Sequence, residues 1–264
     1  MPNETSSRPL ALITGASSGI GAAFARRLAA DGHDLIIHGR RKELLDALAA
    51  ELAQKHNTPC EVLIAELSDD AGIELVAQRA ASAAPDLLIN NAGIGAGGKF
   101  VDPDIAPKLA MLRVHIDATV RITHAALPAM RARGSGAIIN VASVAGLAPS
   151  GGSVLYGASK AFLVFFSESL ALDLAGTGVR VQALCPGLTH TDFHSRIGLD
   201  YSRLPESMWQ SADAVAAESL RCLARGRTLC ITGSVNRLMV WLYRHLPLSW
   251  YTSLMRMGTR RYKV

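Results

Sequence analysis

Short runs of Leu, Ile and Val alternate along this chain with longer stretches rich in Ala, and this alternation limits the possible folds more than any other feature. A short apolar run followed by a longer amphipathic stretch is typical of a buried β-strand followed by a crossover helix. Repetition of this unit predicts a doubly wound α/β fold, with a seven-stranded parallel sheet and helices on both faces. The predicted strands lie at residues 10–14, 34–38, 60–65, 86–90, 136–141, 179–184 and 228–231.

The longer stretches predict helices within a single domain. The chain has 264 residues, of which 49% are apolar and 19% charged, and this suits one globular α/β domain. It contains no internal repeat and no linker rich in Pro, Gly or Ser. We therefore expect one domain at residues 1–232 and a helical extension at residues 233–264. The predicted helices of the domain lie at residues 19–31, 41–56, 70–83, 106–133, 154–176 and 211–225.

The N-terminal residues and the cysteines lead us to expect a cytoplasmic protein without a bound metal. The start, MPNETSSRPLALIT, lacks the basic residues and apolar core of a secretory signal. No run approaches the roughly 20 apolar residues that a membrane-spanning helix needs. The cysteines, at Cys60, Cys185, Cys222 and Cys230, are scattered without the CxxC spacing of a metal or redox site.

The net charge of +5 arises at the C-terminal end of the chain. Residues 231–264 contain six of the 27 Lys and Arg residues and none of the 22 acidic residues. A nucleic-acid-binding domain normally presents a basic face together with a recognition motif, and the main domain has neither. We therefore expect no nucleic-acid partner.

A glycine-rich turn follows the first predicted strand and opens the first predicted helix. The turn, TGASSGIG, contains Gly15, Gly19 and Gly21. Glycines permit a tight turn and close approach of the backbone, so that free amides at a helix N-terminus can face a pyrophosphate. The position of this turn predicts a Rossmann-like nucleotide-binding site.

The end of the second predicted strand bears on the choice of nucleotide. An NAD-binding fold commonly has an acid there that contacts the adenosine ribose, whereas this chain has Gly39, Arg40 and Arg41. An arginine pair suits the 2′-phosphate of NADP. The alternative is a solvated helix start, although cations there oppose the helix macrodipole. We expect NADP(H) in preference to NAD(H).

Tyr156 and Lys160 stand four residues apart in the stretch VLYGASKAFLV, so one helix face would carry both. Alone, this spacing is more often a half-buried ring beside a solvated charge. The pair follows small polar residues at two strand ends, in NNAG and in NVASVAG with Ser143, and precedes Pro186 and Gly187. The order TGxxxGxG, NNAG, Ser, YxxxK and PG, over about residues 8 to 232, resembles the classical short-chain dehydrogenase/reductases.

The resemblance implies roles for three of these residues. Tyr156 would be the general acid/base, Ser143 would hydrogen-bond the substrate oxygen, and Lys160 would hold the nicotinamide ribose while favouring the tyrosinate. A phenol with a pKa of about 10 needs a nearby positive charge to exchange protons near neutral pH, which agrees with these roles. The implied function is hydride transfer between NADP(H) and a carbonyl or secondary alcohol.

The same resemblance assigns the residues that contact the cofactor. In the stretch AELSD, Glu66 precedes Leu67 on the adenine side, where the family usually has an Asp. The NNAG stretch would contact the adenosine, and the loop after the sixth strand would contact the nicotinamide. The expected set is Gly15, Ser17, Ser18, Gly19, Ile20, Gly21, Arg40, Arg41, Glu66, Leu67, Asn91, Ala92, Gly93, Tyr156, Lys160, Pro186, Gly187, Leu188, Thr189 and Thr191.

His115 departs from the family pattern. The family has an Asn in the long helix before the fifth strand, and the ending with Leu127, Pro128 and Met130 aligns His115 with that Asn. The resemblance implies a locally distorted helix and a water-linked proton path to the lysine. A His also donates and accepts hydrogen bonds, but it can change charge near neutral pH. We place His115 in the catalytic set as a member of this relay; the alternative is a packing role.

Residues from about 188 to 210 are the expected cover over the substrate. Their apolar side chains suggest a lipophilic carbonyl or alcohol, although such side chains also suit packing of the cover onto the domain. They are Phe193, Ile197, Leu199, Tyr201, Leu204, Met208 and Trp209.

The extension predicts one or two short basic amphipathic helices broken by Pro247, with Trp241, Leu242, Trp250 and Leu254 on their apolar side. Three roles are open for it. It could close the substrate pocket, dock on a partner subunit, or lie peripherally on a membrane, where aromatic and cationic side chains both find favourable contacts.

Two other functions compete with hydride transfer. One is a non-redox enzyme of the same fold, such as an epimerase or dehydratase, and the other is a cofactor-binding or membrane-associated adaptor. The intact set of Ser143, Tyr156 and Lys160 argues against an adaptor. The resemblance further suggests a homodimer or homotetramer built on the two long helices, whereas substrate identity and reaction direction are not readable from a fold.

Overall fold

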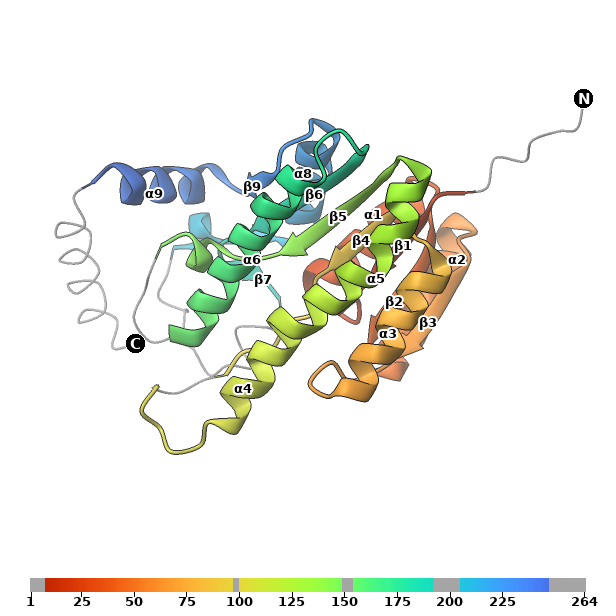
Figure 1. Ribbon diagram of the computed structural model, residues 1–264, viewed down its shortest axis with the longest axis horizontal. Helices are drawn as coiled ribbons and strands as arrows, with labels where there is room; N and C mark the ends of the chain where they lie inside the picture. The colour runs from red at the N-terminus through yellow and green to blue at the C-terminus, as the bar shows by residue number, and fades with distance from the viewer. Residues whose placement is uncertain (1–7, 97–99, 149–153, 192–204, 247–264) are drawn as a thin grey trace, which may run out of the picture.

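The computed structural model describes residues 8–96, 100–148, 154–191 and 205–246. Seven parallel strands form one sheet in the order β3-β2-β1-β4-β5-β6-β9, so the chain winds outward from β1 in both directions (Figure 1). This confirms the predicted doubly wound α/β fold. The strands are β1 (Leu10–Ile13), β2 (Asp34–Gly39), β3 (Cys60–Ile64), β4 (Leu87–Asn90), β5 (Gly136–Val141), β6 (Val179–Cys185) and β9 (Leu229–Ile231).

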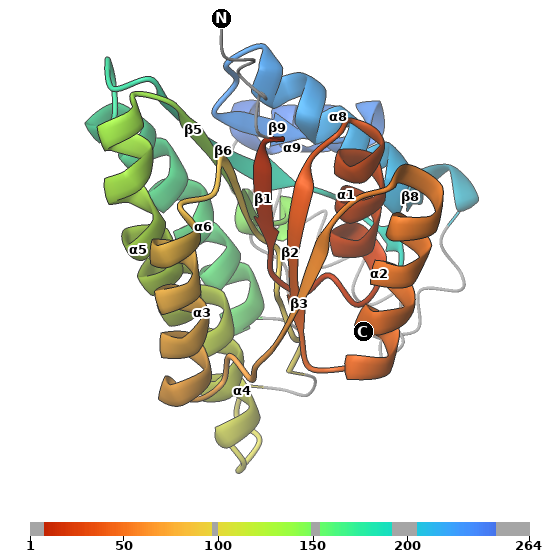
Figure 2. The same cartoon turned by 90° about the vertical axis from the view of Figure 1, so that its right-hand side faces the viewer.

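Helices cover both faces of this sheet (Figure 2). α1, α2 and α8 pack on one face, and α3, α5 and α6 pack on the other. The arrangement is the one that right-handed crossovers between parallel strands produce. The helices are α1 (Gly19–Ala30), α2 (Lys42–His56), α3 (Asp70–Ala83), α4 (Ala106–Leu112), α5 (Ala118–Arg133), α6 (Val154–Asp173), α8 (Ala212–Ala224) and α9 (Ser234–His245).

The strands β1, β2, β4 and β5 are buried on both faces of the sheet. Leu12 and Ile36 belong to the core under α3 and α5, whereas Ile13 and Ile37 belong to the core under α1 and α2. Successive strand residues point to opposite faces, so both must be apolar when both faces are covered. This is why the strands appear in the sequence as continuous apolar runs.

The helix predicted over residues 106–133 contains a π-helical turn. α4 ends at Leu112, a π-helical turn spans Arg113–Asp117, and α5 begins at Ala118. The predicted helical stretch is therefore confirmed, and the π-turn within it inserts an extra residue that rotates its two α-helical halves relative to each other. The local distortion that the family resemblance implies at His115 is confirmed.

Two short strands hold the ends of the expected substrate cover. β7 (Thr189–His190) and β8 (Gln210–Ser211) pair in parallel, and a 3-10 turn at Glu206–Met208 precedes β8. Residues 192–204 lie outside the described residues, and with them the expectations for Phe193, Ile197, Leu199, Tyr201 and Leu204.

The C-terminal extension begins with α9, as predicted. Asn236 and Val240 are buried against the domain, whereas Leu238 and Trp241 are exposed. Pro247, Trp250 and Leu254 lie outside the described residues, so a second helix in the extension stays a prediction.

Candidate active site

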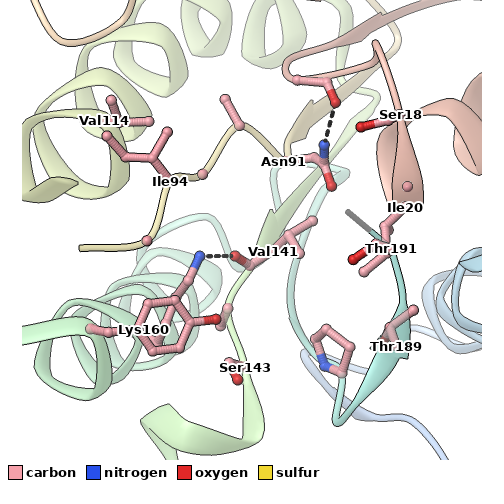
Figure 3. A pocket seen from close by; sticks show the side chains of 18 of the residues that line it. Ser18, Ile20, Asn91, Ile94, Val114, Val141, Ser143, Lys160, Thr189 and Thr191 are labelled. Carbon is pink, nitrogen blue, oxygen red and sulfur yellow. Dashed lines mark hydrogen bonds between the residues drawn. The ribbon is translucent and has the colours of Figure 1, made fainter. Parts of the chain in front are cut away.

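A cavity of about 640 Å³ lies at the carboxyl ends of the central strands, where ligands bind in doubly wound sheets (Figure 3). Loops that follow six of the strands contribute to its lining, together with α6 and α9. The volume is in the range of small-molecule sites. Ser143, Tyr156 and Lys160 line it, and so does every residue of the expected cofactor set except Gly21.

The glycine-rich turn is packed too tightly for side chains. Gly15 has a φ of +68°, and a Cβ there would lie 2.7 Å from the Cα atom of Ala92. A Cβ on Gly21 would lie 2.4 Å from the Gly15 carbonyl oxygen, so Gly21 serves packing beneath the turn. The Asn91 side chain donates to the carbonyls of Thr14 and Gly15 at 2.9 and 3.0 Å. Asn91 thus anchors the turn to the loop after β4.

The two arginines after β2 have different partners. The Nη2 atom of Arg41 donates to the hydroxyls of Ser17 and Ser18 at 2.9 and 2.7 Å, so this guanidinium lies against the glycine-rich turn. Arg40 forms a 2.8 Å ion pair with Glu66, and both side chains are partly exposed. Arg41 therefore adds positive charge at the phosphate end of the cavity, while Glu66 offsets the charge of Arg40.

Ser143, Tyr156 and Lys160 come to the cavity from two elements. Ser143 follows β5 and caps a short 3-10 turn at Val144–Gly146, whereas α6 carries the other two residues. The turn and α6 touch at Gly146, where a Cβ would lie 2.5 Å from the Lys160 carbonyl carbon. This close backbone approach brings the serine next to the helix that carries the Tyr and Lys.

Lys160 is a buried cation close to the phenol ring. Its Nζ atom donates to the Val141 carbonyl at 2.8 Å (Figure 3) and lies 5.7 Å from the centre of the Tyr156 ring. Burial lowers the pKa of Lys160 from 10.5 to about 8. A nearby cation lowers the pKa of a phenol, because it favours the ionised form.

His115 lies behind the cavity wall and is fully buried. Its Nδ1 atom is 2.9 Å from the Ser159 hydroxyl, and its Nε2 atom accepts the Ile94 amide at 3.3 Å. Its ring meets that of Tyr156 edge-on, with 5.7 Å between the ring centres. Burial, and then the charge of Lys160, lower the pKa of His115 well below its usual value. These surroundings favour the neutral form of the His115 ring.

The cavity also has lining residues outside the predicted set. His38 lies at the end of β2, Val114 lies in the π-turn, and Asn236 and Met239 lie on α9. Asn236 fills the space beside Gly187, where a Cβ would lie 2.3 Å from its Nδ2 atom. In the sequence, the contact between Asn236 and Gly187 is indicated only by a polar residue within the amphipathic extension. The two positions meet only in the folded chain.

A model of the family described as short chain dehydrogenase matches residues 9–202, which is well over half of the chain. The chain belongs to the short-chain dehydrogenase/reductase family. This confirms the resemblance that the motifs suggest. The protein is therefore an oxidoreductase of alcohol or carbonyl groups that binds a nicotinamide cofactor.

Individual members of this family resemble most of the chain. Sulfoacetaldehyde reductase 2 of Chromohalobacter salexigens is 39% identical over 237 residues, which are 88% of this chain and 93% of that protein. A short-chain dehydrogenase from Sphingobium yanoikuyae, solved in complex with NADPH, has a TM-score of 0.81 at 36% identity and covers 96% of this chain and 95% of its own. The bulky-bulky ketone specific alcohol dehydrogenase from Comamonas testosteroni has a TM-score of 0.78 at 31% identity, with coverages of 96% and 94%.

Proposed function

We propose that this protein is an NADP(H)-dependent oxidoreductase in which Tyr156 exchanges a proton with the oxygen of a carbonyl or secondary alcohol. The observation that carries the proposal is a shared cavity: Tyr156 and Lys160 line the same space as the glycine-rich turn and Arg41. A proton donor and a hydride donor therefore fit within one site. An epimerase or a dehydratase would cause no net oxidation of NADPH. Measuring NADPH oxidation therefore separates a reductase from these two alternatives.

The residues around the cavity fit a dinucleotide phosphate. The turn has no room for side chains at Gly15 and Gly21, so the first amides of α1 can approach a pyrophosphate. Arg41, with the hydroxyls of Ser17 and Ser18, would hold the 2′-phosphate. When bound, the cofactor supplies or accepts the hydride.

Three side chains would act on the substrate oxygen and its proton. Ser143 would donate a hydrogen bond to this oxygen, which holds the carbonyl in place. Tyr156 would give its phenolic proton to the same oxygen during reduction and take it back during oxidation. Lys160 would stabilise the tyrosinate that remains, and its bond to Val141 keeps the ammonium in position.

We also propose a substrate with a lipophilic body. Met208 and Met239 border the cavity and add apolar surface that adapts to irregular ligands. The name of the Comamonas testosteroni relative agrees with this proposal, whereas that of the Chromohalobacter salexigens relative indicates a small anionic aldehyde.

NADPH oxidation with a graded panel tests the reductase and its substrate class separately. The panel contains ketones and aldehydes of increasing apolar size, together with sulfoacetaldehyde. We expect kcat/KM to rise with apolar size. A preference for sulfoacetaldehyde would contradict the lipophilic proposal alone, and no turnover of any carbonyl would contradict the reductase.

Replacing Arg41 with Ala is expected to raise KM for NADPH about 10- to 100-fold and to leave KM for NADH within about twofold, because a charge-assisted hydrogen bond contributes about 1.5–3 kcal/mol. Steady-state kinetics with both cofactors measure the change. Arg26→Ala is the matched control, since Arg26 pairs with Glu51 on the outer side of α1 and α2. An equal loss with both cofactors would mean that Arg41 does not select NADP.

We propose a homo-oligomer that buries the outer face of α6. Phe165 and Leu172 on this face are 73% and 78% exposed. Among the described residues α6 is the one helix with the length and composition of a membrane span, but it packs against β6 and buries Lys160. An exposed apolar face on such a helix suits a second copy of the chain.

Phe165→Glu tests this interface. The substitution is expected to lower the molecular mass measured by light scattering by at least a factor of about two, because an unpaired charge in an interface is strongly unfavourable. Leu75→Glu on α3 is the control, since Leu75 is also exposed but lies on another helix. An unchanged mass for the Phe165 variant would exclude this face as the interface.

The extension contributes to the cavity through Asn236 and Met239 of α9, which favours pocket closure among its three considered roles. On the outer side of α9, Leu238 and Trp241 are more than half exposed. Peripheral membrane contact and a cytoplasmic location stay predictions from the sequence.

A further inference from the structure

His115 connects three elements behind the active site. The residue lies in the π-turn, its Nδ1 atom contacts the Ser159 hydroxyl on α6, and its Nε2 atom accepts the amide of Ile94 in the loop after β4. Ser159 in turn donates to the Tyr156 carbonyl at 2.8 Å. Val114, the neighbour of His115 in the π-turn, and Ile94 both line the cavity (Figure 3).

These partners fix the tautomer of the imidazole. A serine hydroxyl has one hydrogen, and Ser159 donates it to the Tyr156 carbonyl. In the contact between Ser159 and His115 the hydroxyl oxygen must therefore accept, so Nδ1 of His115 carries the hydrogen. The Ile94 amide can only donate, so Nε2 carries no hydrogen. Each ring nitrogen therefore has one partner and one fixed role.

A second proton on the ring would be unfavourable at this position. It would place two N–H groups against each other at Ile94, and it would add a second buried cation beside Lys160. Tyr156 and Lys160 of α6 are the titratable groups that face His115 in the described contacts, and neither offers a carboxylate. The surroundings thus favour the neutral ring.

We propose that His115 is a positioning residue that takes up no proton during turnover, and that it holds the Tyr156 and Lys160 face of α6 in register with the cavity wall through Ser159. The proposal rests on the proposed function, since the register matters for proton exchange by Tyr156. It replaces the proton-relay role considered from the sequence. A relay would need a ring nitrogen that both gains and loses a proton, and both nitrogens are already used.

Nitrogen NMR of the full-length protein tests the fixed tautomer without any turnover. Histidine labelled with ¹⁵N is incorporated, and the His115 signals are assigned by their absence in His115→Asn. We expect a protonated Nδ1, an unprotonated Nε2, and unchanged shifts between pH 6 and 9. A protonated Nε2, or a titration within this range, would overturn the proposal even if the enzyme turns over normally.

Ser159→Ala tests the positioning role by kinetics. Loss of both hydrogen bonds of the Ser159 hydroxyl, to His115 and to the Tyr156 carbonyl, is expected to lower kcat about 5- to 10-fold at every pH from 6 to 9 and to leave KM for NADPH unchanged. The apparent pKa of the rate profile should stay where it is in the wild type. A shifted profile would indicate a relay, and an unchanged kcat would remove the positioning role.

Ser167→Ala is the matched control on the same helix. Ser167 is equally buried and also donates to a carbonyl one turn earlier, but it accepts from Asn140 away from the active site. It is expected to lose stability without the loss in kcat. If wild-type enzyme shows no Tyr156-dependent turnover, the proposed function fails, whereas the tautomer measurement still decides the state of His115.

Discussion

Replacing Tyr156 with Phe is expected to lower kcat for carbonyl reduction about 1000-fold, because general acid catalysis contributes about 10²- to 10⁴-fold and the variant lacks the only proton that the ring can give. The aromatic ring stays, with its edge-on contact to His115 and its place beside Lys160. The cavity wall should therefore stay intact. The Kd for NADPH is expected to change by less than about threefold, since the ring oxygen is not part of the phosphate cradle.

Two measurements separate chemistry from binding in this variant. Single-turnover NADPH oxidation gives the chemical step, and fluorescence titration gives the Kd. Tyr243→Phe on α9 is the matched control, since Tyr243 lies outside the described cavity lining and is expected to keep wild-type turnover. Turnover of the Tyr156 variant within about tenfold of wild type would rule out Tyr156 as the proton donor.

Replacing Lys160 with Met is expected to lower kcat/KM at least about 100-fold while the apoenzyme at pH 7 is no less stable than wild type. The activity falls because the tyrosinate loses its nearby cation, and each pKa unit of lost stabilisation corresponds to about 1.4 kcal/mol. The fold tolerates the change because Met has a similar length and needs no solvation. The variant loses the hydrogen bond from Lys160 to the Val141 carbonyl, but it no longer buries a charged group, and the second effect offsets the first.

The pH dependence of the free energy of unfolding shows whether the buried ammonium of Lys160 stabilises or destabilises the fold. Lys160 has a pKa of about 8 in the folded protein, against about 10.4 in an unfolded chain. Below pH 8 both states hold the proton, and the folded state bears the full penalty of a buried cation. Between these values only the unfolded state is protonated, so the contribution of this group to stability rises with pH, by about 3 kcal/mol in all.

Urea unfolding of both apoenzymes at pH 7 and pH 10 checks the expected sign. The wild type should gain stability relative to the Met variant as the pH rises, since the variant has no ammonium to neutralise. A variant that is several kcal/mol less stable at pH 7 would show that the ammonium stabilises the fold, contrary to the expectation from its burial.

Most of the fold and of the cofactor site follows from interactions between near neighbours in the chain. Apolar runs such as Leu10–Ile13 predict strands because both faces of the sheet are covered. The glycine-rich turn predicts a phosphate site because its geometry depends on a few consecutive residues. The spacing of Tyr156 and Lys160 places both side chains on one face of α6 because the helical repeat is constant.

Contacts between distant segments account for what these patterns could not predict. The π-turn at Arg113–Asp117 leaves no clear mark on the apolar periodicity, because the hydrogen bonds of His115 run to Ser159 and Ile94 on other elements. The lowered pKa of His115 likewise results from burial and from the charge of Lys160, which is distant from His115 in the chain. Asn236 meets Gly187 only after α9 folds over the cavity. Local sequence is thus sufficient for the elements, the turn and the catalytic spacing, whereas the environment of each side chain depends on long-range packing.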